Sequence, residues 1–130
     1  MSTASQAIAP KRILYVEDDS DSRELLCVLL KNHELVTAAT ATHGAKLARV
    51  GRFDLYVLDN RYEDGSGIEL CRQIRTFDSV TPVLFFSGMS DSRHIREAEN
   101  AGAQEYLIKP RDIAILEEAV ERLLGGGPSH

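Results

Sequence analysis

The sequence predicts an α/β protein with a five-stranded parallel sheet that is covered by helices on both faces. Three observations predict it: five short apolar runs recur along the chain, a longer segment with helical spacing follows each run, and nothing repeats internally. Such runs are too short for buried helices, and regular alternation of strand and helix is typical of parallel sheets. Right-handed crossovers then favour the doubly wound strand order 2-1-3-4-5.

The strands are predicted from runs that are rich in apolar, β-branched and aromatic residues. They are Ile13–Val16, Leu35–Val36, Leu55–Leu58, Val83–Phe86 and Tyr106–Ile108. The second run is the shortest and most polar. We therefore expect it to lie at an edge of the sheet.

The helices are predicted from apolar residues that recur three and four positions apart. These residues lie in the segments Leu25–Leu30, Ala45–Val50, Ile68–Ile74, Ile95–Ala101 and Leu116–Leu123. Ser66 and Glu69 have the spacing of a capping box, which predicts that the third helix begins there.

The chain has 130 residues, a length that is typical of one domain. We place that domain at 12–124, between a flexible lead-in at 1–11 and a flexible tail at 125–130 that starts with three glycines. A net charge of −5 disfavours direct binding to nucleic acid. No apolar stretch or leader pattern indicates a membrane or secretion, so we expect a cytoplasmic location. Cys27 and Cys71 lie in apolar segments, and we expect both to be buried.

Polar side chains follow four of the predicted strands at the point where each strand ends. Glu17 and Asp18 follow the first strand, Asp59 the third, Ser87 the fourth and Lys109 the fifth. In open α/β sheets, ligands bind beyond the carboxyl ends of the strands, where the strand order reverses. That point lies between the first and third strands, which carry the acids.

This set of side chains suits phosphoryl transfer. Clustered carboxylates repel one another unless a cation neutralises them, and Mg²⁺ (or Mn²⁺) prefers such oxygen ligands. Lys109 and Ser87 add a positive charge and a hydroxyl. A carboxylate can itself be the nucleophile and form an aspartyl phosphate. An isolated acid after a strand, such as Asp19 or Asp64, is more simply explained as a loop residue or a helix cap.

Over residues 12–124 these motifs resemble the receiver domain of response regulators in two-component signalling, in its single-domain form. The matching stretches are Ile13–Asp18, Phe53–Asp59 with Gly67 eight residues on, Thr81–Ser87 and Ala101–Pro110. The resemblance implies a flavodoxin-like (βα)5 fold. It also implies a phosphorelay protein that assists its own phosphorylation and dephosphorylation and is not an enzyme with a separate substrate.

The resemblance assigns roles to individual residues. Asp59 would accept the phosphoryl group from a histidine kinase or a histidine phosphotransfer protein. Asp18 and Asp59 would ligate Mg²⁺ directly, Glu17 would act through water, and the backbone carbonyl of Arg61 would complete the protein ligands. Lys109 would pair with a phosphoryl oxygen.

Two further residues would form the switch of such a domain. Ser87 would move toward the phosphoryl group, and Tyr106 would follow it inward and alter the face formed by the fourth helix, fifth strand and fifth helix. On the residues alone, Tyr106 is equally well explained as a strand aromatic that packs on its neighbours.

The sequence departs from the family in the segment Asn60–Asp64, where apolar residues and a proline are usual, and at Gly88, where alanine is common. Arg61 has three interpretations that the residues leave open. It could reach over the site and tune the lifetime of the phosphorylated state, pair with Glu63, or face solvent.

We expect the chain to act by binding an unidentified partner or by handing the phosphoryl group on, because the six residues after Leu124 cannot hold an output domain. A fragment of a larger regulator is the alternative organisation. A receiver-like scaffold that needs no phosphorylation is the alternative function. An aspartate-nucleophile phosphatase is disfavoured, because Arg61 stands where such enzymes need a second acid. Whether phosphorylation drives formation of a homodimer stays open.

Overall fold

The computed structural model describes residues 9–125, in which strands and helices alternate. In chain order the elements are β1 (Arg12–Val16), α1 (Ser20–Leu29), β2 (Glu34–Ala38), α2 (Ala41–Val50), β3 (Leu55–Leu58), β4 (Arg61–Tyr62), β5 (Gly65–Ser66), α3 (Gly67–Arg75), β6 (Val83–Ser87), α4 (Ser92–Asn100), β7 (Glu105–Ile108) and α5 (Ile113–Leu123). Five strands form a parallel sheet in the order β2-β1-β3-β6-β7. This order is the predicted 2-1-3-4-5, so the α/β fold is confirmed. The short antiparallel hairpin of β4 and β5 was not predicted.

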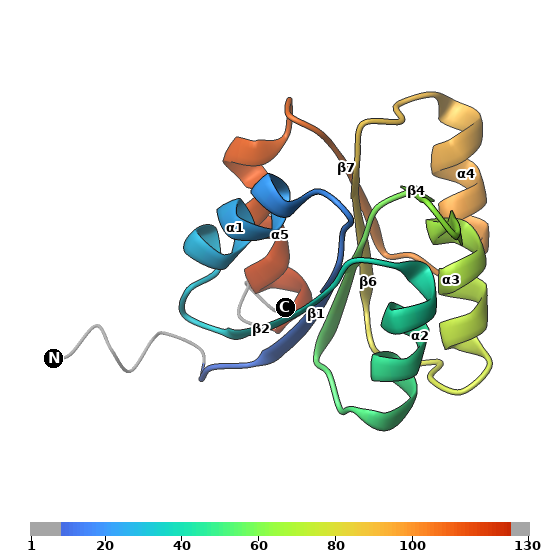
Figure 1. Cartoon of the computed structure of the whole chain (residues 1–130). Coiled ribbons are helices and arrows are strands. Elements are labelled where there is room, and N and C mark those ends of the chain that lie inside the picture. The colour runs from blue at the N-terminus through green and yellow to red at the C-terminus, as the bar shows by residue number, and fades with distance from the viewer. Residues whose placement is uncertain (1–8, 126–130) are drawn as a thin grey trace, which may run out of the picture.

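Each face of the sheet is covered by helices, with α1 and α5 on one side and α2, α3 and α4 on the other (Figure 1). Alternate side chains of a strand point to opposite faces. Thus Ile13 and Tyr15 belong to the core beneath α1 and α5, whereas Leu14 and Val16 belong to the core beneath the other three helices. The buried strands read as continuous apolar runs because both of their faces are covered.

The strand β2 lies at an edge of the sheet, as expected from its polar sequence. It is longer than the apolar pair Leu35–Val36 and extends over Glu34–Ala38. Backbone pairing with β1 continues past the apolar residues, from Glu34 opposite Arg12 to Ala38 opposite Val16. Side-chain polarity therefore underestimates the length of this strand.

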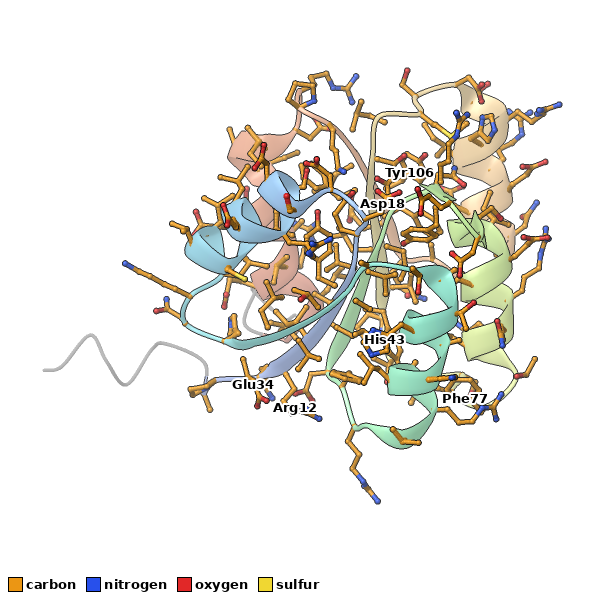
Figure 2. All side chains as sticks on the ribbon, viewed as in Figure 1. Arg12, Asp18, Glu34, His43, Phe77 and Tyr106 are labelled. Atoms are coloured by element: carbon orange, nitrogen blue, oxygen red, sulfur yellow. The ribbon has the colours of Figure 1, made fainter. Side chains whose placement is uncertain are left out.

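The register brings the carboxyl ends of the central strands level with one another. Val16 pairs with Leu58, Leu58 pairs with Phe85, and Ser87 pairs with Ile108. The residues that follow β1, β3 and β7 therefore emerge at one rim of the sheet together with the last residue of β6. Figure 2 shows Asp18 and Tyr106 toward this end of the molecule, with Arg12 and Glu34 toward the opposite end.

Side chains cap the helices that begin at this rim. The Ser66 hydroxyl accepts a hydrogen bond from the Glu69 amide at 3.1 Å, which is half of the predicted capping box and starts α3. Asp64 reaches across from the β4–β5 hairpin and accepts from the amides of Ala41 and Thr42, at the start of α2. The hairpin is thereby tied to a helix that precedes it in the chain.

The prediction that both cysteines are buried is confirmed for Cys71 and wrong for Cys27. Cys71 is buried in α3 and its thiol donates to the carbonyl of Ala101, but Cys27 is exposed on α1. The apolar face of α1 is narrower than its leucines suggest: Leu26 is fully buried, whereas Leu25 is 47% exposed. Cys27 lies next to Leu26, outside that narrow face.

The predicted lead-in at 1–11 and tail at 125–130 fall mostly on residues 1–8 and 126–130, which lie outside the described residues, so both stay predictions. Among the helices formed by residues 9–125, none has the length and apolar character needed to span a bilayer.

Candidate functional site

The centre of the site is an ion bridge made by residues from three strand ends. The Lys109 ammonium donates hydrogen bonds to Oε1 of Glu17 and, at 3.0 Å, to Oδ2 of Asp59. The side chain of Glu17 is 2% exposed, that of Asp59 15% and that of Lys109 21%. The bridge is therefore largely shielded from water, which strengthens the attraction between its charges.

Alternation along the strands explains why these three residues meet. Tyr15, Val57 and Leu107 all point into the core beneath α1 and α5. Glu17, Asp59 and Lys109 each come two residues later, so the same side of the sheet receives them. The charged cluster is a continuation of that apolar core beyond the ends of the strands.

Burial raises the pKa of Glu17, and hydrogen bonds from Lys109 and from the Asp19 amide oppose the increase. The Tyr15 hydroxyl also donates to the Glu17 carboxylate, at 3.1 Å. Burial acts to lower the pKa of Lys109, but hydrogen bonds and charge from Glu17 and Asp59 outweigh it, so that the pKa of Lys109 is raised. Lys109 is therefore a persistent cation at the rim.

The carboxylate of Asp59 is held at both oxygens. Its Oδ1 accepts the backbone amide of Asn60 at 2.6 Å, while Oδ2 faces Lys109. Behind it, the amide of Gly67 donates to the Asn60 carbonyl at 3.1 Å, which ties the start of α3 to this turn. The arrangement presents a fixed, anionic oxygen pair at the end of β3.

Asp18 is exposed at the same rim and carries a second carboxylate. Among residues 9–125, no three acidic, histidine or cysteine side chains converge closely enough to hold a metal without other ligands. Mg²⁺ needs only one or two carboxylates, because it retains several waters and takes carbonyl or phosphate oxygens as well. Three carboxylates against one lysine also leave excess negative charge. The donor set therefore suits a hard divalent cation.

On the opposite side of the sheet, a polar chain links the turn after β3 to the loop after β6. The Asn60 side-chain amide donates to the Tyr106 hydroxyl at 3.2 Å, and that hydroxyl donates to the Met89 carbonyl at 2.7 Å. The Ser87 hydroxyl accepts the Met89 amide at 3.2 Å. The Tyr106 ring stacks on Phe85 with the ring centroids 5.5 Å apart.

Arg61 lies exposed in β4. Within the part of the chain that the structure describes, its guanidinium forms no ion pair with Glu63 and no hydrogen bond to the charged cluster. This placement corresponds to the solvent-facing interpretation of the three that the sequence left open.

Two residues of the site were not singled out from the sequence. Asn60 is 4% exposed and links Asp59 to Tyr106, and Tyr62, also 4% exposed, contacts the Asp59 amide through its hydroxyl. The sequence shows only that an asparagine and a tyrosine stand in a segment where apolar residues are usual. Each of these side chains contacts a residue of another element, and the sequence does not identify those partners.

Comparison with known proteins matches the chain to one family. The family model for the response regulator receiver domain matches residues 13–121. The transcriptional regulatory protein AfsQ1 of Streptomyces coelicolor is 32% identical over 117 residues, which cover 88% of this chain and 52% of that protein. Protein PetR of Rhodobacter capsulatus is 38% identical over 104 residues, which cover 78% of this chain and 44% of PetR. The chain thus spans about half the length of these relatives.

Solved structures show the same likeness. A LuxR-family two-component response regulator from Aurantimonas superposes with a TM-score of 0.84 and 31% identity, over 93% of this chain and 89% of that chain. The response regulator TrrA of Thermotoga maritima, solved in complex with Mg²⁺ and BeF, superposes with a TM-score of 0.78 and 30% identity, over 87% of this chain and 98% of that chain.

Proposed function

This chain belongs to the family of response regulator receiver domains, and from that premise we propose that it is a phosphoryl-accepting switch whose phosphorylated residue is Asp59. The observation that supports the proposal most directly is the Lys109 bridge between Glu17 and Asp59. It holds one carboxylate at the end of a central strand, where the strand order reverses and ligands of open α/β sheets bind.

In the proposed reaction, a lone pair of an Asp59 carboxylate oxygen forms a bond to phosphorus. The phosphorus–nitrogen bond of a phosphohistidine donor breaks, and its electron pair stays on the imidazole nitrogen. Asp59 becomes an acyl phosphate. Lys109, already a donor to Asp59 Oδ2 at 3.0 Å, stabilises the negative oxygens of the transferred group. Attack by water on the acyl phosphate reverses the switch.

Asp18, Asp59 and the backbone carbonyl of Arg61 would hold Mg²⁺, with Glu17 acting through a water molecule. The ion, when bound, neutralises charge on the transferring phosphoryl group. The residues of the chain do the positioning: the Asn60 amide and Lys109 orient the Asp59 carboxylate. The buried Glu17 carboxylate, which accepts a hydrogen bond from Lys109, keeps that ammonium at the rim.

Ser87 and Tyr106 form the output of the proposed switch. Once a phosphoryl group is present, the Ser87 side chain turns so that its hydroxyl donates to a phosphoryl oxygen and no longer accepts from the Met89 amide. That change moves the loop after β6, whose Met89 carbonyl accepts from Tyr106. The surface formed by α4, β7 and α5 then differs between the two states. A local change of charge biases the whole face, as in other phosphorylation switches.

The partners that fit this proposal are a histidine kinase or a histidine phosphotransfer protein as donor, and a protein target as receiver of the signal. Two transcriptional regulatory proteins, AfsQ1 and CrdR, are longer than this chain, and the match covers only 52% and 57% of their lengths. For residues 9–125 we propose recognition of proteins, in keeping with a net charge of −5 over the whole sequence.

The direct test is incubation with Mg²⁺ and phosphoramidate, followed by intact-mass measurement. We expect a labile phosphoryl adduct on the wild type and none on Asp59→Asn. The matched control is Asp54→Asn, because Asp54 and Asp59 flank the same strand, β3, at its two ends. Asp54→Asn should retain the adduct.

Two results would contradict the proposed switch. A wild type without any adduct would favour the scaffold that works without phosphorylation. An adduct that persists in Asp59→Asn would mean that the phosphorylated residue is another one. Omission of Mg²⁺ should slow adduct formation, because the carboxylates then retain their mutual repulsion.

A further inference from the structure

The Tyr62 hydroxyl is inserted between the ends of two neighbouring strands. Tyr62 is buried within the core beneath α2, α3 and α4, and it belongs to the β4–β5 hairpin. Its hydroxyl accepts the backbone amide of Asp59 at 2.7 Å and donates to the backbone carbonyl of Val16 at 2.9 Å. Neither contact involves another side chain.

The direction of the strand hydrogen bonds shows what this insertion replaces. The Tyr56 amide donates to the Pro82 carbonyl, which precedes β6, so this amide points toward β6. Amide directions alternate from one residue of a strand to the next, and Asp59 lies three residues after Tyr56. The Asp59 amide therefore points toward β1. The Glu17 amide donates to the Ala38 carbonyl at the end of β2, so the carbonyl of Val16 points toward β3. The two backbone groups face each other, and the register pairs Val16 with Leu58. A regular ladder would join them directly.

In this protein the hydroxyl oxygen occupies that position. A direct bond would place the amide nitrogen and the carbonyl oxygen about 2.9 Å apart. Among residues 9–125 the Asp59 amide and the Val16 carbonyl form no direct hydrogen bond, and two consecutive hydrogen bonds through the hydroxyl join them instead. The carboxyl ends of β1 and β3 are therefore bridged by one oxygen atom, directly before the acids Glu17 and Asp18.

We propose that Tyr62 is a positioning residue for the metal and phosphoryl site: its hydroxyl sets the separation between the acids after β1 and the phosphoacceptor Asp59. This inference rests on the proposed function, because that separation matters only if both strand ends serve one site. Without the hydroxyl, the strand ends can pair directly, which changes the distance between the two sets of carboxylates.

The test compares Tyr62→Phe with Tyr56→Phe. Both variants remove one hydroxyl from a buried tyrosine, but the Tyr56 hydroxyl bonds to Asp78, remote from the rim. We would measure Mg²⁺ affinity by titration of backbone amide NMR signals, the rate of phosphorylation by phosphoramidate, and the midpoint of thermal unfolding. We expect Tyr62→Phe to weaken Mg²⁺ binding by about tenfold and to slow phosphorylation, while Tyr56→Phe leaves both unchanged.

Equal Mg²⁺ affinity in the wild type and Tyr62→Phe would overturn the positioning role. A wild type that binds no Mg²⁺ and forms no adduct would instead overturn the proposed function, and the role of Tyr62 with it. If Tyr62→Phe does not fold, hydrogen exchange of the Asp59 amide in the wild type decides: slow exchange supports the bridge, and exchange at the rate of an unprotected amide overturns it.

Discussion

At the scale of one residue, Gly67 shows that the turn after β3 needs a position without a side chain eight residues after Asp59. A Cβ atom at this position would lie 1.8 Å from the backbone carbonyl oxygen of Asp59. The start of α3 can approach the turn after β3 only because no side chain is present. Gly67 therefore has a steric role in the site rather than a chemical one.

We expect Gly67→Ala to lower the free energy of unfolding by about 1–3 kcal/mol, because backbone on one side of the contact must move. Urea denaturation would measure it. The matched control is Gly88→Ala: a Cβ atom there would have no neighbour within 4 Å, and its φ is not in the left-handed region. That variant should be unchanged or more stable, by up to about 1 kcal/mol. Equal costs for the two variants would contradict the steric explanation.

At the scale of elements, Arg75 joins two loops at the end of the sheet opposite the site. From the last residue of α3, its guanidinium donates to the carbonyls of Asp78 at 3.0 Å, Thr81 at 2.7 Å and Gly102 at 2.8 Å. It thereby connects the α3–β6 loop to the turn that leads into β7. Gly102 has φ +115, and a Cβ atom there would lie 2.7 Å from Nε of Arg75.

We expect Arg75→Ala to lower the free energy of unfolding by about 2 kcal/mol, because several charge-assisted hydrogen bonds are lost at once. Arg75→Lys should recover only part of the loss, since an ammonium lacks the planar donor geometry of a guanidinium. The control is Arg72→Ala, an exposed arginine on the same helix, which should change stability by less than about 0.5 kcal/mol. An equal loss of unfolding free energy in Arg75→Ala and Arg72→Ala, measured by urea denaturation, would contradict the role of Arg75 in joining the loops.

For the whole molecule, both cores share one sheet, and the stability of that single unit depends on carboxylates that are bonded in the folded state. Asp78 is the clearest case remote from the site. Its carboxylate accepts from the Tyr56 hydroxyl at 2.8 Å and from the Thr81 amide at 3.0 Å. Partial burial acts to raise the pKa of Asp78, but these hydrogen bonds outweigh it and lower the pKa to about 2.

The sign of the pH effect follows from the difference between the pKa of Asp78 in the folded state and in the unfolded chain. The pKa of an aspartate in an unfolded chain is about 3.9. Above that pH the folded state gains stability from the ionised Asp78, and the gain is lost as the pH falls from about 4 through 2. Solvent screening limits it to about 1 kcal/mol. Urea denaturation between pH 2 and 7 should therefore show a weaker pH dependence for Asp78→Asn than for the wild type or for Glu118→Gln, an exposed control. An equal pH dependence of the unfolding free energy in the wild type and Asp78→Asn would contradict this role of Asp78.

The sequence by itself determined the kind of each major element, the strand order and the end of the sheet where polar groups gather. The physical reason is that short apolar runs and helical stripes are local patterns, and parallel strands must bring their carboxyl ends to one rim. Glu17, Asp59 and Lys109 could be expected together for that reason, although they lie up to 92 residues apart.

Only the tertiary structure decided which polar groups touch. The insertion of the Tyr62 hydroxyl between Val16 and Asp59 depends on the register of β1 and β3 and on the path of the β4–β5 hairpin. The contact of Asn60 with Tyr106 joins positions 46 residues apart. The exposure of Cys27 depends on how α1 rotates about its axis when it packs on the sheet. Such contacts are set by packing between elements, and a local pattern carries no information about its distant partner.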